Sequence, residues 1–556
     1  MTIRDDIEHL VRNALADAQR SDLLPKVEVE EISIERPQNS EHGDFASSLP
    51  LKLARPMRMS PMIIAEKLES LIPAQGILER VSVATPGFIN FSLNPSWLVE
   101  QVEAIRQAGD HFGNVDLGGG QRVQIEFISA NPVGPLHVAH ARGGVIGSAL
   151  ANIMEAAGYD VDREYYFNDA GAQIIHFKRS LFARYEQQFG RDAQVPEDGY
   201  QAEYMVELAQ EIKDEEGDRL LMLPEEQALD EIGALGLAMM MGRIREDVQL
   251  LRITFDSWFN EATLFQEGQF EKSMKLLGDR GFVTERDGAT WFASTRLGDE
   301  KDKVLVRSNG IPTYFASDVA YHYNKFFERK YDKVINIWGA DHQGHAAFIK
   351  AVVGALGVPE EKMTLLINQL VTLKRGGEVV RISKRTGDMI TLRDVIDEVG
   401  ADACRYFFLS RDANSQMEFD MELAKKESQE NPVYYVQYAH ARIASILRLA
   451  EERSIDFSQG DVTLLTHEAE LSLIRKMLEL PELIVMIART LEPHHLPHYS
   501  SELAAAFHWF YQNCRVVSSE DGDEAITRAR LKLVDAARIA LARCLSLMIM
   551  DAPLHM

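Results

Sequence analysis

The stretch from residue 123 to residue 144 constrains the fold of this chain more than any other. A mostly apolar run, 123–128, predicts a buried strand, and a turn containing Pro and Gly at 131–135 ends it. His137 and His140 follow three positions apart at the start of a predicted helix, so both rings lie on one helical face. The free N–H groups and partial positive charge of a helix N-terminus suit a phosphate. This order of elements, with two added imidazoles, predicts a site for a nucleotide triphosphate.

Two further segments have the residue types of a nucleotide site. Residues 335–345 form an apolar, strand-like run that ends at Gly339 and Asp341, with His342 and His345 just beyond. A carboxylate accepts two hydrogen bonds and therefore suits ribose hydroxyls. Residues 381–387, Arg-Ile-Ser-Lys-Arg-Thr-Gly, form a basic loop after a predicted strand at 378–382. Taken alone, the histidines could be ordinary surface residues or metal ligands and the loop a solvated basic face; without a cysteine or a third histidine at ligand spacing, we expect no metal site.

Together and in this order, the three segments resemble the signatures of the class I aminoacyl-tRNA synthetases. His137-Val-Ala-His140 resembles the "HIGH" signature, with Ala139 where that family usually has Gly. Residues 381–385 resemble "KMSKS", with Arg381 in place of Lys and Ile382 in place of Met. The segments 41–46, 86–90, 166–173, 311–318 and 431–442 narrow the resemblance to the arginyl-tRNA synthetases, over nearly the whole chain.

The resemblance implies an arginine–tRNA ligase. Such an enzyme activates L-arginine with ATP to arginyl-adenylate, releases pyrophosphate, and transfers arginine to the 3′ adenosine of tRNA(Arg) for protein synthesis. We expect ATP to bind with Mg²⁺ as substrate, and no tightly bound cofactor. The implied catalytic residues are His137, His140 and Lys384. The implied ATP-binding residues are His137, Ala139, His140, Gly339, Asp341, His345, Ser383 and Lys384.

Arginine recognition requires acidic side chains, because a guanidinium pairs best with a carboxylate. By resemblance, Asp318 takes the guanidinium, and Tyr314, four positions earlier, supplies a wall and a hydroxyl. Glu126 and Asn131 flank the same crevice. The sequence leaves open which carboxylate holds the guanidinium and which the α-amino group. The implied arginine-binding set is Glu126, Asn131, His137, Tyr314, Asp318 and His342.

The chain has 556 residues, which is too long for one hydrophobic core. Alternating strands and helices over 113–420 predict an α/β domain with a Rossmann-like parallel sheet, interrupted by a helical insertion at about 175–275. Residues 1–112 predict a separate α/β unit, with a helix over 3–20 and strands over 27–34, 81–84 and 88–93. Residues 421–556 have helical periodicity throughout and predict an all-helical bundle.

In the resembled family, the N-terminal unit contacts the elbow of tRNA and the bundle binds the anticodon. The implied elbow contacts are Phe88 and Asn90, although a core Phe and a turn Asn explain these residues equally well. The implied anticodon contacts are Tyr435, Tyr438 and Tyr511, since unpaired bases stack on aromatic rings. An aromatic stripe that packs the bundle is the alternative.

The formal net charge of −26 is unusual for a protein that binds nucleic acid. Acidic residues are concentrated in 186–231, whereas the C-terminal helices carry several arginines, so contact with tRNA is expected to be local and sensitive to salt. The chain has a charged N-terminus, three cysteines and no run of 18 apolar residues. We therefore expect a cytoplasmic monomer with buried thiols and no membrane span.

Two other functions were compared with this one. A cysteine-type class I ligase would read the thiol with zinc, and the chain lacks a suitable ligand set. A noncatalytic tRNA-binding paralogue is suggested by Ala139 and Arg381, but the retained His137, His140, Asp341 and Lys384 argue against it.

Overall fold

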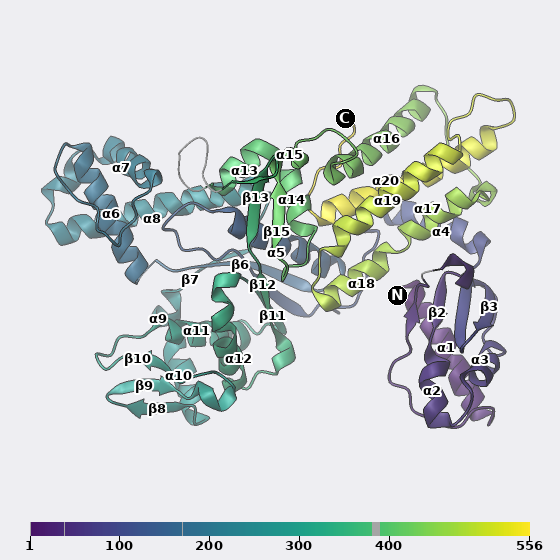
Figure 1. Ribbon diagram of the computed structural model, residues 1–556, viewed down its shortest axis with the longest axis horizontal. Coiled ribbons are helices and arrows are strands. Elements are labelled where there is room, and N and C mark those ends of the chain that lie inside the picture. Colours follow the sequence, from purple (N-terminus) through teal and green to yellow (C-terminus); the bar gives the residue numbers. More distant parts are fainter. Residues whose placement is uncertain (1, 38, 170, 381–389) are drawn as a thin grey trace.

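A parallel five-stranded sheet stands at the centre of the computed structural model, which describes residues 2–37, 39–169, 171–380 and 390–556 (Figure 1). The strand order is β12-β11-β5-β6-β7. The chain builds β5, β6 and β7 in one direction and then returns to add β11 and β12 on the other side of β5, so the switch point lies between β5 and β11. Ligands bind at the carboxyl ends of the strands beside such a point. The predicted Rossmann-like parallel sheet is confirmed. Its strands are β5 (Arg122–Glu126), β6 (Asp160–Phe167), β7 (Ser257–Asn260), β11 (Lys333–Gly339) and β12 (Met363–Asn368).

Helix α5 (Val138–Ala156) packs against this sheet through glycines. A Cβ atom at Gly147 would lie 2.3 Å from the Phe127 ring, and one at Gly144 would lie 2.8 Å from the Ile128 and Ile253 side chains. Larger residues at these positions would push the helix away from the end of β5. The close packing therefore holds the start of α5, with its two histidines, beside the carboxyl edge of the sheet.

The other face of the sheet carries a row of buried polar side chains. Asn336 of β11 is the register partner of Glu126 of β5, and Glu126 is the register partner of Glu164 of β6. Register partners in a parallel sheet point to the same face. Helix α11 (Tyr314–Tyr323) and the π-helical turn Asn324–Glu328 send side chains to this row. One face of the sheet is therefore apolar against α5 and the other is charged.

Two insertions extend from the sheet and lie to its left in Figure 1. The first consists of three helices between β6 and β7, and it has an apolar core of its own. It is shorter than the predicted helical segment, because Ser257–Asn260 is a strand of the central sheet. Its helices are α6 (Ala172–Gln188), α7 (Glu203–Glu216) and α8 (Glu225–Leu250).

The second insertion precedes α11 and was not predicted. Its antiparallel sheet has strands of only four residues, which are too short to show a clear alternation of apolar and polar residues. It packs with its helices and with α12 (Ala346–Ala355) around a second core. Its elements are α9 (Thr263–Gln266), α10 (Gln269–Asp279), β8 (Val283–Arg286), β9 (Ala289–Phe292) and β10 (Lys303–Val306).

The N-terminal unit is a four-stranded antiparallel sheet in the order β1-β2-β4-β3, covered by helices. The predicted helix over 3–20 is confirmed, and Thr2 forms a capping box at its start. The strand predicted over 27–34 is wrong except for its last residue, because pairing begins only at Ile34. The elements are α1 (Ile3–Arg20), β1 (Ile34–Glu35), β2 (Phe45–Ser47), α2 (Leu49–Met57), α3 (Pro61–Glu69), β3 (Leu78–Ala84), β4 (Phe88–Leu93) and α4 (Pro95–Ala108).

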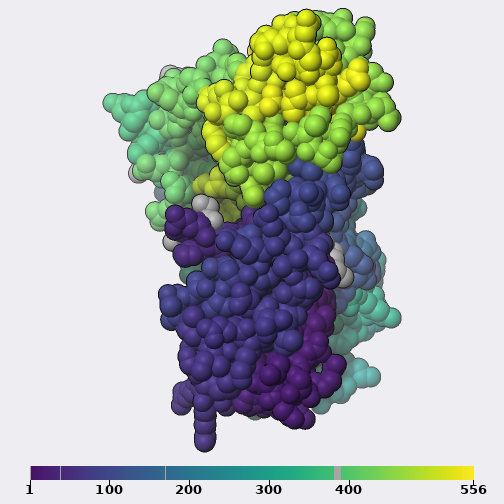
Figure 2. Space-filling view, turned by 90° about the vertical axis from the view of Figure 1, so that its right-hand side faces the viewer, coloured from purple at the N-terminus to yellow at the C-terminus, as the bar shows by residue number. Residues whose placement is uncertain are grey.

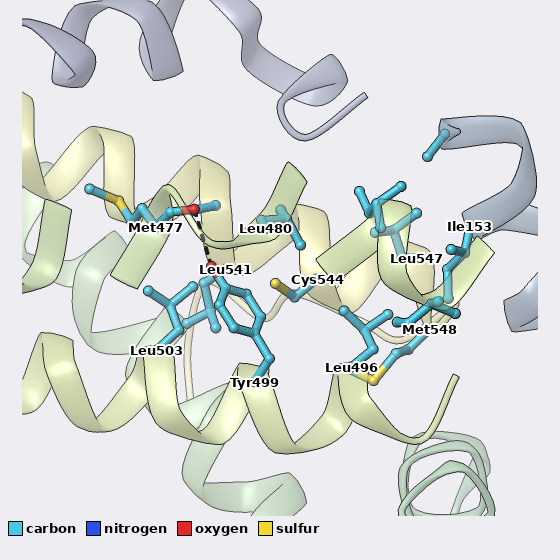
Figure 3. Packing of buried hydrophobic residues seen from close by; sticks show 14 of the residues in the cluster. Ile153, Met477, Leu480, Leu496, Tyr499, Leu503, Leu541, Cys544, Leu547 and Met548 are labelled. Atoms are coloured by element: carbon cyan, nitrogen blue, oxygen red, sulfur yellow. Dashed lines mark hydrogen bonds between the residues drawn. The ribbon is translucent and has the colours of Figure 1, made fainter. Parts of the chain in front are cut away.

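The C-terminal part is all helical, as predicted. Tyr499, Leu503, Leu541 and Cys544 point toward one another in its core, and Ile153 of α5 reaches the same apolar layer (Figure 3). All three cysteines of the chain are free and buried. Within the described parts of the chain, no helix is long and apolar enough to span a membrane. The helices are α16 (Pro432–Glu452), α17 (Glu468–Met477), α18 (Leu480–Thr490), α19 (His495–Asn513) and α20 (Glu524–Leu547).

Ion pairs and one buried arginine join these parts. The N-terminal unit lies against the bundle (Figure 2), where Arg36 pairs with Glu482 at 3.3 Å and Arg475 pairs with Asp44 at 2.8 Å. The segment between the sheet and the bundle contains β13 (Val371–Arg375), β14 (Glu378–Val379), α13 (Leu392–Val399), α14 (Ala401–Leu409), β15 (Met417–Asp420) and α15 (Met421–Ala424). Within it, Arg405 is fully buried and donates to the Leu251 and Met548 carbonyl oxygens and to Ser148 Oγ. One guanidinium thus links α5, the end of α8 and the chain after α20.

The glycine contact of α5 gives a stability prediction. We expect Gly147→Ala to lower the free energy of unfolding by about 1–3 kcal/mol, because the new methyl group overpacks against Phe127. Gly242→Ala in α8 is the matched control: its Cβ would meet nothing within 4 Å, and the change should stabilise by about 0.4–1 kcal/mol. Thermal unfolding of both variants checks this. An unchanged midpoint for Gly147→Ala would show that the Phe127 ring yields without cost.

Candidate active site

The two histidines of the first signature lie together at the start of α5. His137 is the N-cap residue, and its backbone N–H donates to His140 Nδ1 at 3.4 Å. The two rings stack with their centroids 3.8 Å apart. Burial lowers the pKa of both rings, that of His140 to about 3, and the nearby His137 ring lowers the pKa of His140 further. Both imidazoles are therefore neutral at neutral pH and can act as hydrogen-bond partners for a ligand at the helix N-terminus.

The next turn of α5 is held by two neighbouring loops. The Ala139 carbonyl oxygen accepts from Asn368 Nδ2 at 3.1 Å, at the end of β12. Arg142 is fully buried and donates to the carbonyl oxygens of Gln369, Asp412 and Ser415 at 2.8–2.9 Å. Burial lowers the pKa of Arg142 to about 10, so its charge persists at neutral pH. The position of the signature helix is thus fixed by backbone acceptors.

The second predicted segment lies opposite, at the end of β11. A Cβ atom at Gly339 would lie 2.5 Å from Asp341 Oδ1, so a larger residue there would displace this carboxylate. Asp341 begins the short 3-10 helix Ala340–His345 and opposes the lowered pKa of both His137 and His140 through its charge. Its side chain is exposed and pairs with His342 at 3.5 Å. The structure therefore brings the segment of His137 and His140 and the segment 335–345 to one edge of the sheet, across the switch point.

Asp318 and Tyr314 lie beside this edge. The Asp318 carboxylate is 2.7 Å from His345 Nε2, so the residue predicted for arginine contacts a residue predicted for ATP. The His345 ring also lies near the rings of Tyr314 and Trp338, each with a centroid distance of 5.9 Å. Tyr314 is 64% exposed at the start of α11, one turn before Asp318.

Glu126 lies at the bottom of the crevice and is already paired. Its Oε2 accepts from Lys325 Nζ at 2.6 Å and its Oε1 from Ser129 Oγ at 3.0 Å. Ser129 and Ile128 have φ values of 46° and 68°, a left-handed conformation that is strained for a β-branched residue. This turn points the Ser129 hydroxyl at Glu126. Asn131, the other predicted flank, accepts from the Asn168 N–H at 3.1 Å and donates to Gln173 Oε1 at 2.9 Å.

Glu261 is an acidic residue of the site that the sequence analysis missed. It follows β7 directly and accepts from Ser317 Oγ at 2.5 Å and from the Tyr166 hydroxyl at 2.7 Å. Burial raises the pKa of Glu261, and the charge of Asp318 nearby raises it further. The available signal was an acid immediately after a strand, but the strand was hidden because a helical insertion was predicted over 257–260.

The remaining predicted residues are elsewhere. Ser383 and Lys384, together with Arg381 and Ile382, lie outside the described residues. Asn90 is in the middle of β4 and buried, while Phe88 at the start of that strand is half-buried, so Asn90 is not a turn residue. Both belong to the N-terminal unit and not to the crevice.

The three predicted anticodon tyrosines form one cluster on the bundle. The Arg442 guanidinium lies 5.0 Å from the ring centres of both Tyr438 and Tyr511. The Tyr435 ring is 5.1 Å from that of His508, which also lies near Tyr438. The aromatic residues were predicted from the sequence, but Arg442 between them was not. A partly exposed group of rings around a guanidinium is suited to unpaired bases.

Three family models match successive parts of the chain. The model described as "Arginyl tRNA synthetase N terminal domain" matches residues 5–93, "tRNA synthetases class I (R), catalytic domain" matches residues 101–428, and "DALR anticodon binding domain" matches residues 436–556.

Curated relatives and solved structures agree with these family models. Proteins named arginine–tRNA ligase from Dehalococcoides mccartyi and Caldanaerobacter subterraneus are 56% and 45% identical to this chain, over 100% of it and 99% of each relative. The structures of arginyl-tRNA synthetases from Thermus thermophilus and Plasmodium falciparum superpose with TM-scores of 0.78 and 0.77, over 100% of both chains, at 23% and 18% identity. These two structures share the fold of this chain.

The buried histidines predict acid lability. Burial lowers the pKa of both His140 and His322 to about 3. Below an ordinary histidine pKa of about 6.5 the unfolded chain binds these protons and the folded chain does not, so each group should cost about 1.4 kcal/mol of stability per pH unit as pH falls. We expect the free energy of unfolding of His322→Gln to fall less steeply with decreasing pH than that of the parent, by about this amount per pH unit. Thermal unfolding between about pH 6.5 and 5 measures it.

The exposed His342 provides the control for this measurement. His342→Gln should follow the parent throughout the range, because its side chain is largely in solvent. Equal acid slopes for the parent and His322→Gln would show that His322 takes up its proton in the folded state.

Proposed function

The chain belongs to the arginyl-tRNA synthetases of class I, and we propose from its geometry how its residues join arginine to tRNA. It is an arginine–tRNA ligase that uses ATP. The arginine carboxylate attacks the α-phosphate of ATP, giving arginyl-adenylate and pyrophosphate. The terminal adenosine hydroxyl of tRNA then attacks the activated carbonyl carbon, giving arginyl-tRNA and AMP. Positioning and charge stabilisation suffice for both steps, and no protein nucleophile is needed.

The observation that supports the site assignment best is the asymmetry of its acidic groups. Glu126 has Lys325 as an ion-pair partner at 2.6 Å, whereas Glu261 accepts hydrogen bonds from two hydroxyls and Asp318 faces a histidine. A guanidinium carries a full positive charge on a planar fork of donors and needs carboxylates not already matched by a cation. We assign the guanidinium to Asp318 and Glu261, with Tyr314 as the wall, and the α-amino group to Glu126, with Asn131 beside it.

The neutral histidines and Asp341 form the nucleotide side. His137 and His140 would donate hydrogen bonds to the phosphates at the start of α5, with Ala139 against the base and Gly339 and Asp341 at the ribose. His342 and His345 lie next to this ribose position, so both are placed between nucleotide and arginine. Ser383 and Lys384 stay assigned to the triphosphate by their place in the second signature. Mg²⁺ would bind with ATP, held largely by phosphate oxygens and water.

The finer organisation is also a proposal. Residues 1–112 would contact the elbow of tRNA, with Phe88 and Asn90 as candidates, residues 113–420 would carry out catalysis, and residues 421–556 would bind the anticodon. We propose a monomer that acts in the cytoplasm, where tRNA is charged.

The guanidinium assignment predicts a selective loss. We expect Asp318→Ala and Glu261→Gln each to raise the KM for arginine. For Asp318→Ala, the lost binding free energy should be several kcal/mol, since unpairing a buried charge costs about 3–5 kcal/mol. The KM for ATP should change little. Steady-state charging of tRNA measures both constants. Glu328→Gln is the control, because Glu328 lies on the same segment but pairs with the exposed Lys272. A near-normal KM for arginine with normal turnover in Asp318→Ala would refute the pocket.

The aromatic cluster predicts a second selective loss, now for tRNA. Tyr511→Ala should weaken tRNA by about 1–3 kcal/mol, because one base loses its stacking partner. Phe327→Ala is the control, since both rings are 37% exposed but Phe327 lies in the catalytic part. The KM for tRNA in charging assays measures the effect, while arginine-binding constants should stay the same. If both variants behave alike, the ring of Tyr511 only packs the bundle.

A further inference from the structure

A short π-helical turn places two cations beneath the active-site crevice. Helix α11 continues into the turn Asn324–Glu328, and a π-turn inserted into a helix changes the direction of the side chains that follow it. Lys325 Nζ is fully buried and donates to Glu126 Oε2 at 2.6 Å and to Asn336 Oδ1 at 2.9 Å. It also lies 4.0 Å from the centre of the Tyr321 ring.

Each cation has its own carboxylate. Arg329, four positions after Lys325, pairs with Glu164 of β6, which also accepts from Tyr321 and from Gln124 Nε2. Burial would raise the pKa of Glu164, and Arg329, Lys325 and Tyr321 together hold it below its ordinary value. Glu126 and Glu164 are register partners on adjacent strands, so two unmatched charges there would repel each other. Lys325 is therefore the cation that belongs to Glu126.

Beside Asn336 of β11, the charged and hydroxyl-bearing groups that face Glu126 come from four elements. Lys325 comes from the π-turn, Tyr321 from α11, Glu164 and Tyr166 from β6, and Ser129 from the strained turn after β5. Among these, Lys325 is the cation in direct contact with the Glu126 carboxylate. Oε2 is held from below by the ammonium, and Oε1 is held from the side by the Ser129 hydroxyl. The two contacts fix both the charge and the rotation of this carboxylate.

We propose that Lys325 is a positioning residue for the substrate arginine: it matches the charge of Glu126 and orients this carboxylate so that it receives the α-ammonium group. The inference rests on the proposed assignment of Glu126 to the α-amino group. A purely structural Lys325 would support the fold and affect arginine and ATP alike. A positioning Lys325 affects arginine alone, and in a pH-dependent way.

Lys325→Met tests the proposal in tRNA charging by the full chain. Without the ammonium, buried Glu126 takes up a proton more readily, so the α-ammonium group loses its partner as pH falls. We expect kcat/KM for arginine in Lys325→Met to fall by up to about tenfold per pH unit toward the acid side of about pH 6–8.5, while the parent changes much less. The KM for ATP should stay within about twofold of the parent, since a uniform loss would indicate damage to the fold.

Two further variants separate charge from packing. Lys325→Arg keeps a cation and should restore most of the affinity for arginine and remove the acid dependence. Lys272→Met is the matched control, because it removes a lysine paired with Glu328 of the same turn, but an exposed one. It should leave the constants for arginine and ATP unchanged. If Lys325→Met has the parent's pH profile, or if its loss is equal for arginine and ATP, the proposal is overturned.

The double variant Lys325→Met/Glu126→Gln keeps the test valid should Lys325→Met fold poorly, because it buries no unmatched charge. It should bind arginine weakly but without the acid dependence; an acid dependence that persists would show that another group titrates. The single variant Glu126→Gln distinguishes a failure of the Glu126 assignment from a failure of the role proposed for Lys325. It should raise the KM for arginine about 10–100-fold. If it does not, the assignment of Glu126 in the proposed function is wrong, whereas a large effect there with a normal pH profile in Lys325→Met refutes only the role of Lys325.

Discussion

The catalytic part of this enzyme depends on how two glutamates are neutralised on one face of its sheet. Glu126 and Glu164 lie side by side on β5 and β6 and are both buried, where an unmatched charge would cost several kcal/mol. Lys325, in the π-helical turn Asn324–Glu328, and Arg329, which follows that turn, supply the opposite charges. Because those partners come from α11 and the turn after it, the pairs also fix α11 against the sheet. Asp318, Tyr314 and Ser317 are on that helix, so the same ion pairs position the proposed arginine pocket.

This arrangement fits the proposed site, which must be acidic for arginine and still accept a triphosphate. The carboxylates nearest the sheet are matched by cations, and the less well-matched acids, Asp318 and Glu261, lie toward the crevice. On the nucleotide side, neutral histidines and a helix N-terminus provide donors without adding negative charge. Asp341 lies at the edge facing solvent, where its charge is screened. The acidic groups proposed for arginine and the neutral donors proposed for the triphosphate thus lie on opposite sides of the switch point.

The signatures were predictable from the sequence because they are local. A strand, a turn and a helix with His137 and His140 form one continuous segment, and the helical bundle has a clear period over more than a hundred residues. Glu261, Lys325 and Arg329 were not predictable in the same way. Lys325 is 199 residues from Glu126, and its role follows from the register of β5 with β6 and from a π-turn, neither of which leaves a pattern in the sequence. The short strands at 257–260 and within 283–306 were not predicted because four residues are too few to distinguish a strand from a helix.

The buried arginines limit how the site can respond to its substrates. Arg142 fixes the start of α5 to the loops at 369 and 412–415, and Arg405 fixes its middle to α8 and to the chain after α20. Moving α5 would leave buried guanidinium donors without acceptors, which costs more than most ligand contacts return. Adjustment on binding therefore falls to side chains at the rim, such as Tyr314 and Asp341, which are largely in solvent. Because Arg405 joins α5 directly to the chain after α20, the helix that begins with His137 and His140 and the bundle that carries the proposed anticodon cluster are held together by one buried guanidinium.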